Sequence, residues 1–194
     1  MDEPNHHRAS LAERIRRKAR RFALSELPAT EGLDITSFAD VLLAYGNWKF
    51  RQINAVPRQV FVSKELTASW PYPDELAEIS RRLEAGEDVS PFLSKKTSVA
   101  FDASSPEKNG SRQDRDLLLA EWGIHHLHLS LKPGSDSRYA RTRDLLFAIV
   151  TDERAFLINV YPHGSWTKRE LISIAARNWP DEELIPASRV AIGL

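Results

Sequence analysis

Cysteine is absent from the 194 residues of this chain. Disulfide bonds and thiolate-bound metal sites are therefore excluded. The sequence also lacks a run of about 18 consecutive apolar residues, the length that a membrane-spanning helix needs, so we expect no membrane association. The first residues, MDEPNHHRAS, lack the apolar core of a signal peptide, which favours a cytoplasmic location.

An excess of charge of one sign is absent too, because 27 Lys and Arg residues balance 27 Asp and Glu residues. The balance conceals a basic segment near the N-terminus, where Glu13 is the single acid among many cations. The cations of this segment are Arg8, Arg14, Arg16, Arg17, Lys18, Arg20 and Arg21. A nucleic-acid contact, a docking surface for an acidic partner and a solvated helix face all fit this segment.

The first half of the chain predicts several helices. Ser10 and Glu13 have the spacing of a capping box, so we expect a helix over 10–25. A second helix is expected over 35–46, ending at Gly46. The first segment places Leu11, Ile15 and Phe22 at helical spacing in a narrow stripe, as a helix at the surface of a folded body does.

A strand and a further helix follow before the middle of the chain. Residues 58–63, RQVFVS, alternate in the manner of a strand. Apolar residues then recur at helical spacing from Asp74 onward, and Gly86 ends that helix. The first half is therefore predicted to be mostly helical.

The second half reads as strands and one helix. A polar loop over 102–113 precedes a strand at 124–131. A long basic loop, KPGSDSRYARTR, leads to a hairpin with strands at 144–150 and 155–161. A capped helix begins at Ser165.

This order of elements predicts an α+β fold: a helical N-terminal half, then a small, mainly antiparallel sheet with a C-terminal helix. We expect a basic extension at 1–25, a mostly helical segment at 35–101 and a β-rich core at 114–194. The three parts are expected to form one compact domain.

The stretch GIHHLHLS, residues 123–130, places three histidines on the first of these strands. Successive side chains of a strand point to opposite faces. His125 therefore shares a face with Leu127 and Leu129, which we expect to face the core. His126 and His128 are left together on the other, more polar face.

The last strand shows a similar division. Alternation places Phe156, Ile158 and Val160 on one face, and Leu157, Asn159, Tyr161 and His163 on the other. If the polar faces coincide within one sheet, they gather five side chains. These are His126, His128, Asn159, Tyr161 and His163.

Basic residues surround this predicted face. Arg138, Arg141 and Arg143 lie in the basic loop, and Lys168 lies in the first turn of the following helix. A sheet face with histidines, a tyrosine and several cations suits a phosphodiester.

Three interpretations fit this constellation. In metal-independent RNA cleavage, which needs no cofactor, one histidine takes the 2′-hydroxyl proton and another protonates the leaving oxygen. In a metal-dependent phosphodiesterase, His126, His128 and His163 bind Zn or Mn, and Asp144 is the nearest carboxylate. In the third, the histidines only pack, and the protein is a non-enzymatic binding or regulatory subunit.

The segment WGIHHLHLS…RTRDLLFAIVTDERAFLINVYPHGSWTKRELISIA resembles the core of the RelE/HigB toxin superfamily. Members of that superfamily run from a leading strand through an arginine-rich loop and a hairpin to a helix, with His or Tyr at the end of the last strand. The resemblance covers residues 114–176. The chain is also similar to uncharacterised bacterial proteins that share the elements WGIHHLHL and LLFA…H.

The resemblance implies a toxin of a toxin–antitoxin or phage-defence system that cleaves mRNA, typically at the ribosome. Its expected partners are RNA or the ribosome and a protein antitoxin or regulatory partner. The catalytic candidates are His126, His128, Tyr161 and His163. The substrate-binding candidates are Arg138, Arg141, Arg143 and Lys168.

Overall fold

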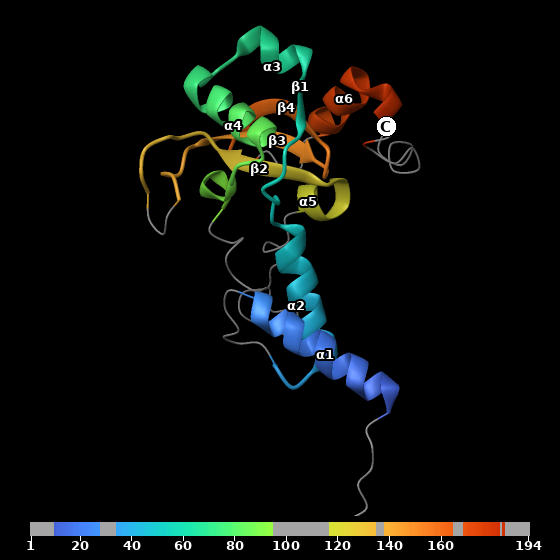
Figure 1. Ribbon diagram of the computed structural model, residues 1–194. Helices are drawn as coiled ribbons and strands as arrows, with labels where there is room; N and C mark the ends of the chain where they lie inside the picture. Colours follow the sequence, from blue (N-terminus) through green and yellow to red (C-terminus); the bar gives the residue numbers. More distant parts are fainter. Residues whose placement is uncertain are drawn as a thin grey trace, which may run out of the picture. The chain divides into compact units, whose positions relative to one another are not determined.

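The structure is a computed structural model that describes residues 10–27, 34–94, 117–134, 138–164, 169–182 and 184 (Figure 1). The chain divides into two compact units, Met1–Phe50 with Lys95–Ser111 and Arg51–Ser94 with Arg112–Leu194. Residues 51–94 thus belong with the sheet and not with the helices of 35–50. The polar loop at 102–113 lies outside the described residues.

The first unit contains a pair of helices. Helix α1 spans Leu11–Glu26 and helix α2 spans Phe38–Phe50. The predicted capping box is confirmed, because the Glu13 N–H donates to Ser10 Oγ at 3.2 Å and the Ser10 N–H donates to Glu13 Oε2 at 2.6 Å. These two bonds satisfy donors that the first turn of a helix leaves without partners.

Two glycines that were expected to end helices behave differently. Gly86 has a φ of 70° and caps helix α4, Pro73–Ala85, as predicted. Gly46 is not among the positive-φ glycines, and α2 continues through it to Phe50. The prediction for Gly46 was wrong because a glycine ends a helix only where the chain turns into the left-handed region.

The second unit is built on a four-stranded sheet in the order β1-β4-β3-β2. Its strands are β1 (Gln59–Val62), β2 (Ile124–His128), β3 (Asp144–Val150) and β4 (Arg154–Pro162). Strand β1 is parallel to β4, and the other two pairs are antiparallel. The α+β fold with a mainly antiparallel sheet is therefore confirmed.

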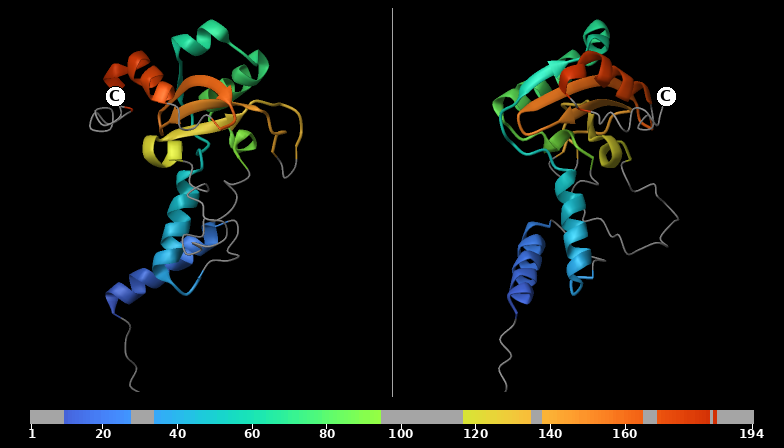
Figure 2. Two further views of the ribbon diagram at one scale, coloured as in Figure 1. Left: turned by 180° about the vertical axis from the view of Figure 1, so that it is seen from behind. Right: turned by 90° about the vertical axis from the view of Figure 1, so that its right-hand side faces the viewer.

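Helices cover both faces of this sheet (Figure 2). One face packs against α3 (Lys64–Ser69), α4 and the 3₁₀ helix η1 (Ser90–Phe92). The other face packs against α5 (Leu117–Trp122) and α6 (Arg169–Asn178), which the 3₁₀ helix η4 (Pro180–Glu182) follows. No helix in the described part of the chain is long and apolar enough to cross a membrane.

A β-bulge interrupts strand β4. Phe147 pairs with Asn159, but its neighbour Ala148 pairs with Leu157, so Ile158 is an extra residue on β4. A bulge reverses the alternation of all residues beyond it.

The bulge corrects the predicted faces of β4. Val160 packs in the cluster that contains Leu157, whereas Tyr161 packs in the cluster of Phe156 and Ile158. The sequence had separated Tyr161 from Ile158. Because of the bulge, Tyr161 lies on the α5–α6 face of the sheet.

Candidate functional site, a cluster of histidines and an arginine

Strand β2 divides its histidines between the two faces of the sheet as the alternation predicts, but the face of His126 and His128 is packed with apolar side chains and is not the more polar face that the sequence indicated. Leu127 and Leu129 belong to the core under α3 and α4. His126 is paired with Phe147 and His128 with Leu145, and both partners belong to the core under α5 and α6. Cross-strand partners share a face, so His126 and His128 lie together on the α5–α6 face.

His128 is held in a defined tautomer. Its side chain is buried, with the residue 3% exposed, and Nδ1 accepts a hydrogen bond from the Thr142 backbone N–H at 3.3 Å. A nitrogen that accepts carries no proton, so the neutral ring is protonated at Nε2. Nε2 is buried and has no hydrogen-bond partner among the described residues.

The surroundings of His128 keep it neutral at physiological pH. Burial lowers its pKa to about 4, and the positive charges of Arg141, His126 and His163 act in the same direction. His128 is therefore a neutral hydrogen-bond donor in the folded protein and not a group that exchanges protons near pH 7.

Thr142 fixes the basic loop, residues 132–143, to the end of β2. Its Oγ1 accepts from the Leu129 N–H at 2.9 Å and donates to the Asp144 carbonyl at 2.7 Å. Together with the bond to His128, these contacts fix the backbone next to Arg141. The contacts of Thr142 were not predicted, because the sequence around a loop threonine does not indicate which distant groups it will bond.

His163 lies in the turn that follows β4. Its backbone N–H donates to the Arg143 carbonyl at 2.6 Å, and its side chain is exposed. Partial desolvation lowers its pKa, and the charges of His126 and Arg141 lower it further. The neutral form, which can accept a proton, is therefore favoured near pH 7.

The positive charge of Arg141 reaches two of the histidines. It lowers the pKa of both His128 and His163, and a proton on His126 acts in the same direction. Arg141 is exposed, and its Nη2 lies 3.5 Å from Ser94 Oγ. A guanidinium beside several imidazole rings has affinity for an anion.

Tyr161 shares the face but lies apart from the histidines. Strand β3 lies between the strand of Tyr161 and the strand of His128, so the backbones of these two residues are about 10 Å apart. Its hydroxyl interacts with Asn159 and with Glu170 of α6, and desolvation is the main cause that raises its pKa. Tyr161 is thus protonated at neutral pH.

The other predicted substrate-binding residues have different positions. Arg138 donates from Nη1 to the carbonyls of Ser90 at 2.9 Å and Leu93 at 3.0 Å, so it supports the backbone of η1. The charge of Arg143 acts on Tyr72, which packs on the α3–α4 face. Lys168 lies outside the described residues.

The described residues do not form the metal site that His126, His128 and His163 were considered for. Within the described ranges, no group of three His, Cys, Asp or Glu side chains is arranged to hold a metal ion. Asp144 accepts a hydrogen bond from the Tyr72 hydroxyl at 2.7 Å, and that tyrosine belongs to the opposite face. The carboxylate nearest in sequence therefore does not join the histidines.

No protein-family model, curated protein or solved structure matches the chain. The functional assignment therefore depends on the chemistry of His126, His128, His163 and Arg141.

Proposed function

We propose that the protein is a toxin-like, metal-independent endoribonuclease of a toxin–antitoxin or phage-defence system. The observation that carries the proposal is the proximity of Arg141 to three histidines, of which His126 and His128 share one face of the sheet and His163 follows β4. A phosphodiester is the anion that histidines can both bind and cleave.

In our proposal, His163 is the general base and His126 is the general acid. His163 takes the proton of a ribose 2′-hydroxyl, and the oxygen attacks the neighbouring phosphorus. The bond from phosphorus to the 5′-oxygen breaks, and protonated His126 donates a proton to that leaving oxygen. The products are a 2′,3′-cyclic phosphate and a 5′-hydroxyl, so no oxidant, metal or other co-reactant is needed.

Repulsion between the two rings favours the protonation state that this reaction needs. A positive charge on His126 lowers the pKa of His163, so protonation of His126 favours the neutral form of His163. A pair that shares one proton contains one acid and one base. Cleavage is therefore expected to have a bell-shaped dependence on pH.

Arg141 and His128 complete the site in our proposal. The exposed Arg141 guanidinium binds the phosphate and stabilises the negative charge that builds up on the phosphorane. His128 holds the backbone at Thr142 next to that arginine. The succession of β2, basic loop, β3–β4 hairpin and α6 supports the proposal, because the RelE/HigB resemblance implies this order.

A non-enzymatic role is the second candidate, and the burial of His128 favours it. The ring is 3% exposed and accepts a backbone hydrogen bond, as a structural histidine does. In that case the protein is a binding or regulatory subunit, and substitution of the histidines reduces solubility or partner binding without any effect on RNA.

Induced expression in bacteria separates these two functions. We expect the wild type to arrest growth and to degrade cellular RNA on an integrity gel, and His126→Ala and His163→Ala to do neither while remaining folded. Arg177→Ala, which removes an exposed arginine of α6, is the control for loss of surface charge. Normal growth with intact RNA on wild-type expression, or equal toxicity of both histidine variants, would contradict the proposal.

A further inference from the structure

The arginine at the centre of the proposed site lies in a loop that is anchored on both sides. We propose that Arg82 of α4 is a positioning residue, which holds Arg141 beside the histidines through its contact with Tyr139. Tyr139 precedes Arg141 by two residues, and Thr142 follows it directly.

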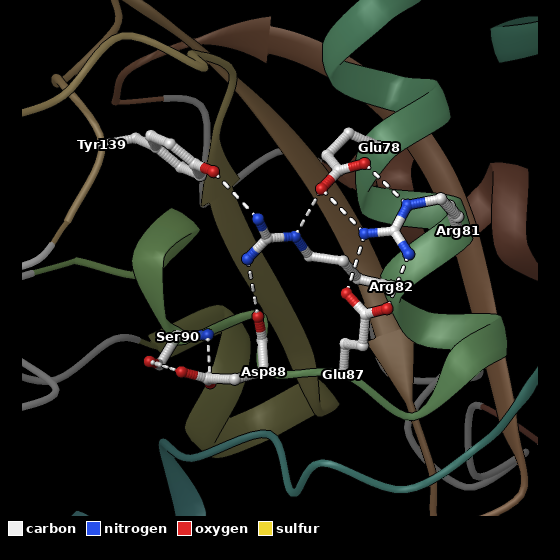
Figure 3. A network of polar contacts seen from close by, with 7 residues as sticks. All are labelled: Glu78, Arg81, Arg82, Glu87, Asp88, Ser90 and Tyr139. Carbon is white, nitrogen blue, oxygen red and sulfur yellow. Dashed lines mark hydrogen bonds and ion pairs between the residues drawn. The ribbon is translucent and has the colours of Figure 1, made fainter.

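The guanidinium of Arg82 is enclosed by partners from three segments (Figure 3). Its Nε donates to Glu78 Oε1 at 2.7 Å, Nη1 donates to the Asp88 carbonyl at 3.0 Å, and Nη2 donates to the Tyr139 hydroxyl at 2.9 Å. The planar fork of an arginine can satisfy all these acceptors at once, which a lysine cannot.

Aromatic rings add a second kind of contact. The Arg82 guanidinium lies 5.4 Å from the ring centre of Phe92 and 5.7 Å from that of Tyr139. The two rings are themselves in contact, with centroids 4.7 Å apart. Because Phe92 is fully buried, the Tyr139 ring contacts the core on one side and the Arg82 guanidinium on the other.

The backbone of the basic loop is tied to the same region. The Tyr139 N–H donates to the Pro91 carbonyl at 3.0 Å, and the Gly134 N–H donates to the Arg138 carbonyl at 2.8 Å. A Cβ at Gly134 would lie 2.8 Å from the Tyr139 carbonyl carbon, so only glycine permits this close approach.

These contacts leave Arg141 little freedom along the backbone. Tyr139 is held by Arg82 and η1, and Thr142 is held by His128 and Leu129. A guanidinium that stabilises transition-state charge is effective only when its position is fixed before the reaction. The catalytic consequence of this inference rests on the proposed function, but the position of Arg141 can be tested without RNA.

The pKa of His163 reports the position of Arg141. The charge of Arg141 lowers the pKa of His163, and Arg141→Ala should therefore raise that pKa, measured by side-chain NMR titration of the full chain. Arg82→Met should shift the His163 pKa upward as well. The double variant should show no shift beyond that of Arg141→Ala, because both changes act through one group.

Arg82→Lys keeps the positive charge and loses the planar fork, so an upward shift in this variant does not come from a lost charge at position 82. Arg81→Met is the matched control, since the hydrogen bonds of Arg81 go to Glu78 and Glu87. We expect the control to leave the His163 pKa unchanged. A His163 pKa that remains at the wild-type value in Arg82→Met and Arg82→Lys, or that does not respond to Arg141→Ala, would overturn the inference.

RNA cleavage gives a separate result. If the wild type cleaves RNA, Arg82→Met should lower kcat in the same direction as Arg141→Ala, with Tm followed to confirm folding. If the wild type does not cleave RNA, the proposed function fails, whereas the response of His163 still decides whether Arg82 positions Arg141.

Discussion

The buried, neutral His128 makes the stability of the sheet depend on pH. In the unfolded chain this ring binds a proton near pH 6.5, whereas in the folded protein its pKa is about 4. Between these values the unfolded state binds more protons, so the free energy of unfolding falls as the pH falls. The contribution is complete above about pH 6.5 and is lost progressively down to about pH 4.

The expected magnitude follows from the two pKa values. Between pH 7 and pH 5, His128 should reduce the free energy of unfolding by about 2 kcal/mol. The residue is 3% exposed, so solvent has little access to the ring. The change is a large part of the stability of an ordinary domain.

Urea denaturation of the wild type and His128→Asn at both pH values measures this contribution. Asparagine can accept the Thr142 N–H through its side-chain oxygen but does not titrate. Other titrating groups act equally in both proteins and cancel in the difference between them. The wild type should lose about 2 kcal/mol more than the variant between pH 7 and pH 5, and equal losses would refute a buried neutral imidazole at this position.

Three further predictions concern the site and the two units. Arg141→Ala should lower kcat for RNA cleavage by on the order of 10²–10³, as loss of a transition-state donor does, while Arg177→Ala leaves it unchanged in the same kinetic assay. Gly134→Ala should destabilise the sheet unit by about 1–3 kcal/mol in urea, because its Cβ meets the backbone of Tyr139; wild-type stability would rule out that close approach. Ser10→Ala should destabilise α1 by about 1 kcal/mol and reduce far-UV helicity, whereas Ser10→Asp, which keeps a cap, should retain it.

Local patterns in the sequence predicted much of the fold. The capping box at Ser10, the left-handed Gly86 and the alternation of His126 and His128 depend on residues close in the chain. Each is decided by the geometry of one helix end or one strand. These predictions agree with the structure for that reason.

Features that depend on distant residues could not be predicted in the same way. The bulge at Ile158 depends on the pairing of β4 with β3, and it places Tyr161 on the face of Phe156 and Ile158, from which simple alternation along β4 had separated it. Arg138 was predicted to bind substrate, but the structure directs it to carbonyls near η1. The parallel pairing of β1 with β4 likewise joins residues 95 positions apart, such as Gln59 and Arg154, a separation at which local patterns carry no information.

The roles of Arg82 and Tyr139 were also beyond sequence reasoning. Arg82 lies among alternating charges on a helix, where salt bridges with neighbouring acids are the ordinary expectation. Only the fold brings its guanidinium to a tyrosine 57 positions further along the chain.

Cleavage of a defined RNA by the purified protein in the presence of EDTA is the decisive test of the proposed endoribonuclease. We expect the wild type to cut the RNA and to leave 2′,3′-cyclic phosphate ends. A strand with deoxyribose at the cut positions should stay intact, and His163→Ala should not cut. Intact RNA with the folded wild type, cleavage of the deoxyribose strand, or undiminished cleavage by His163→Ala would contradict the proposed function.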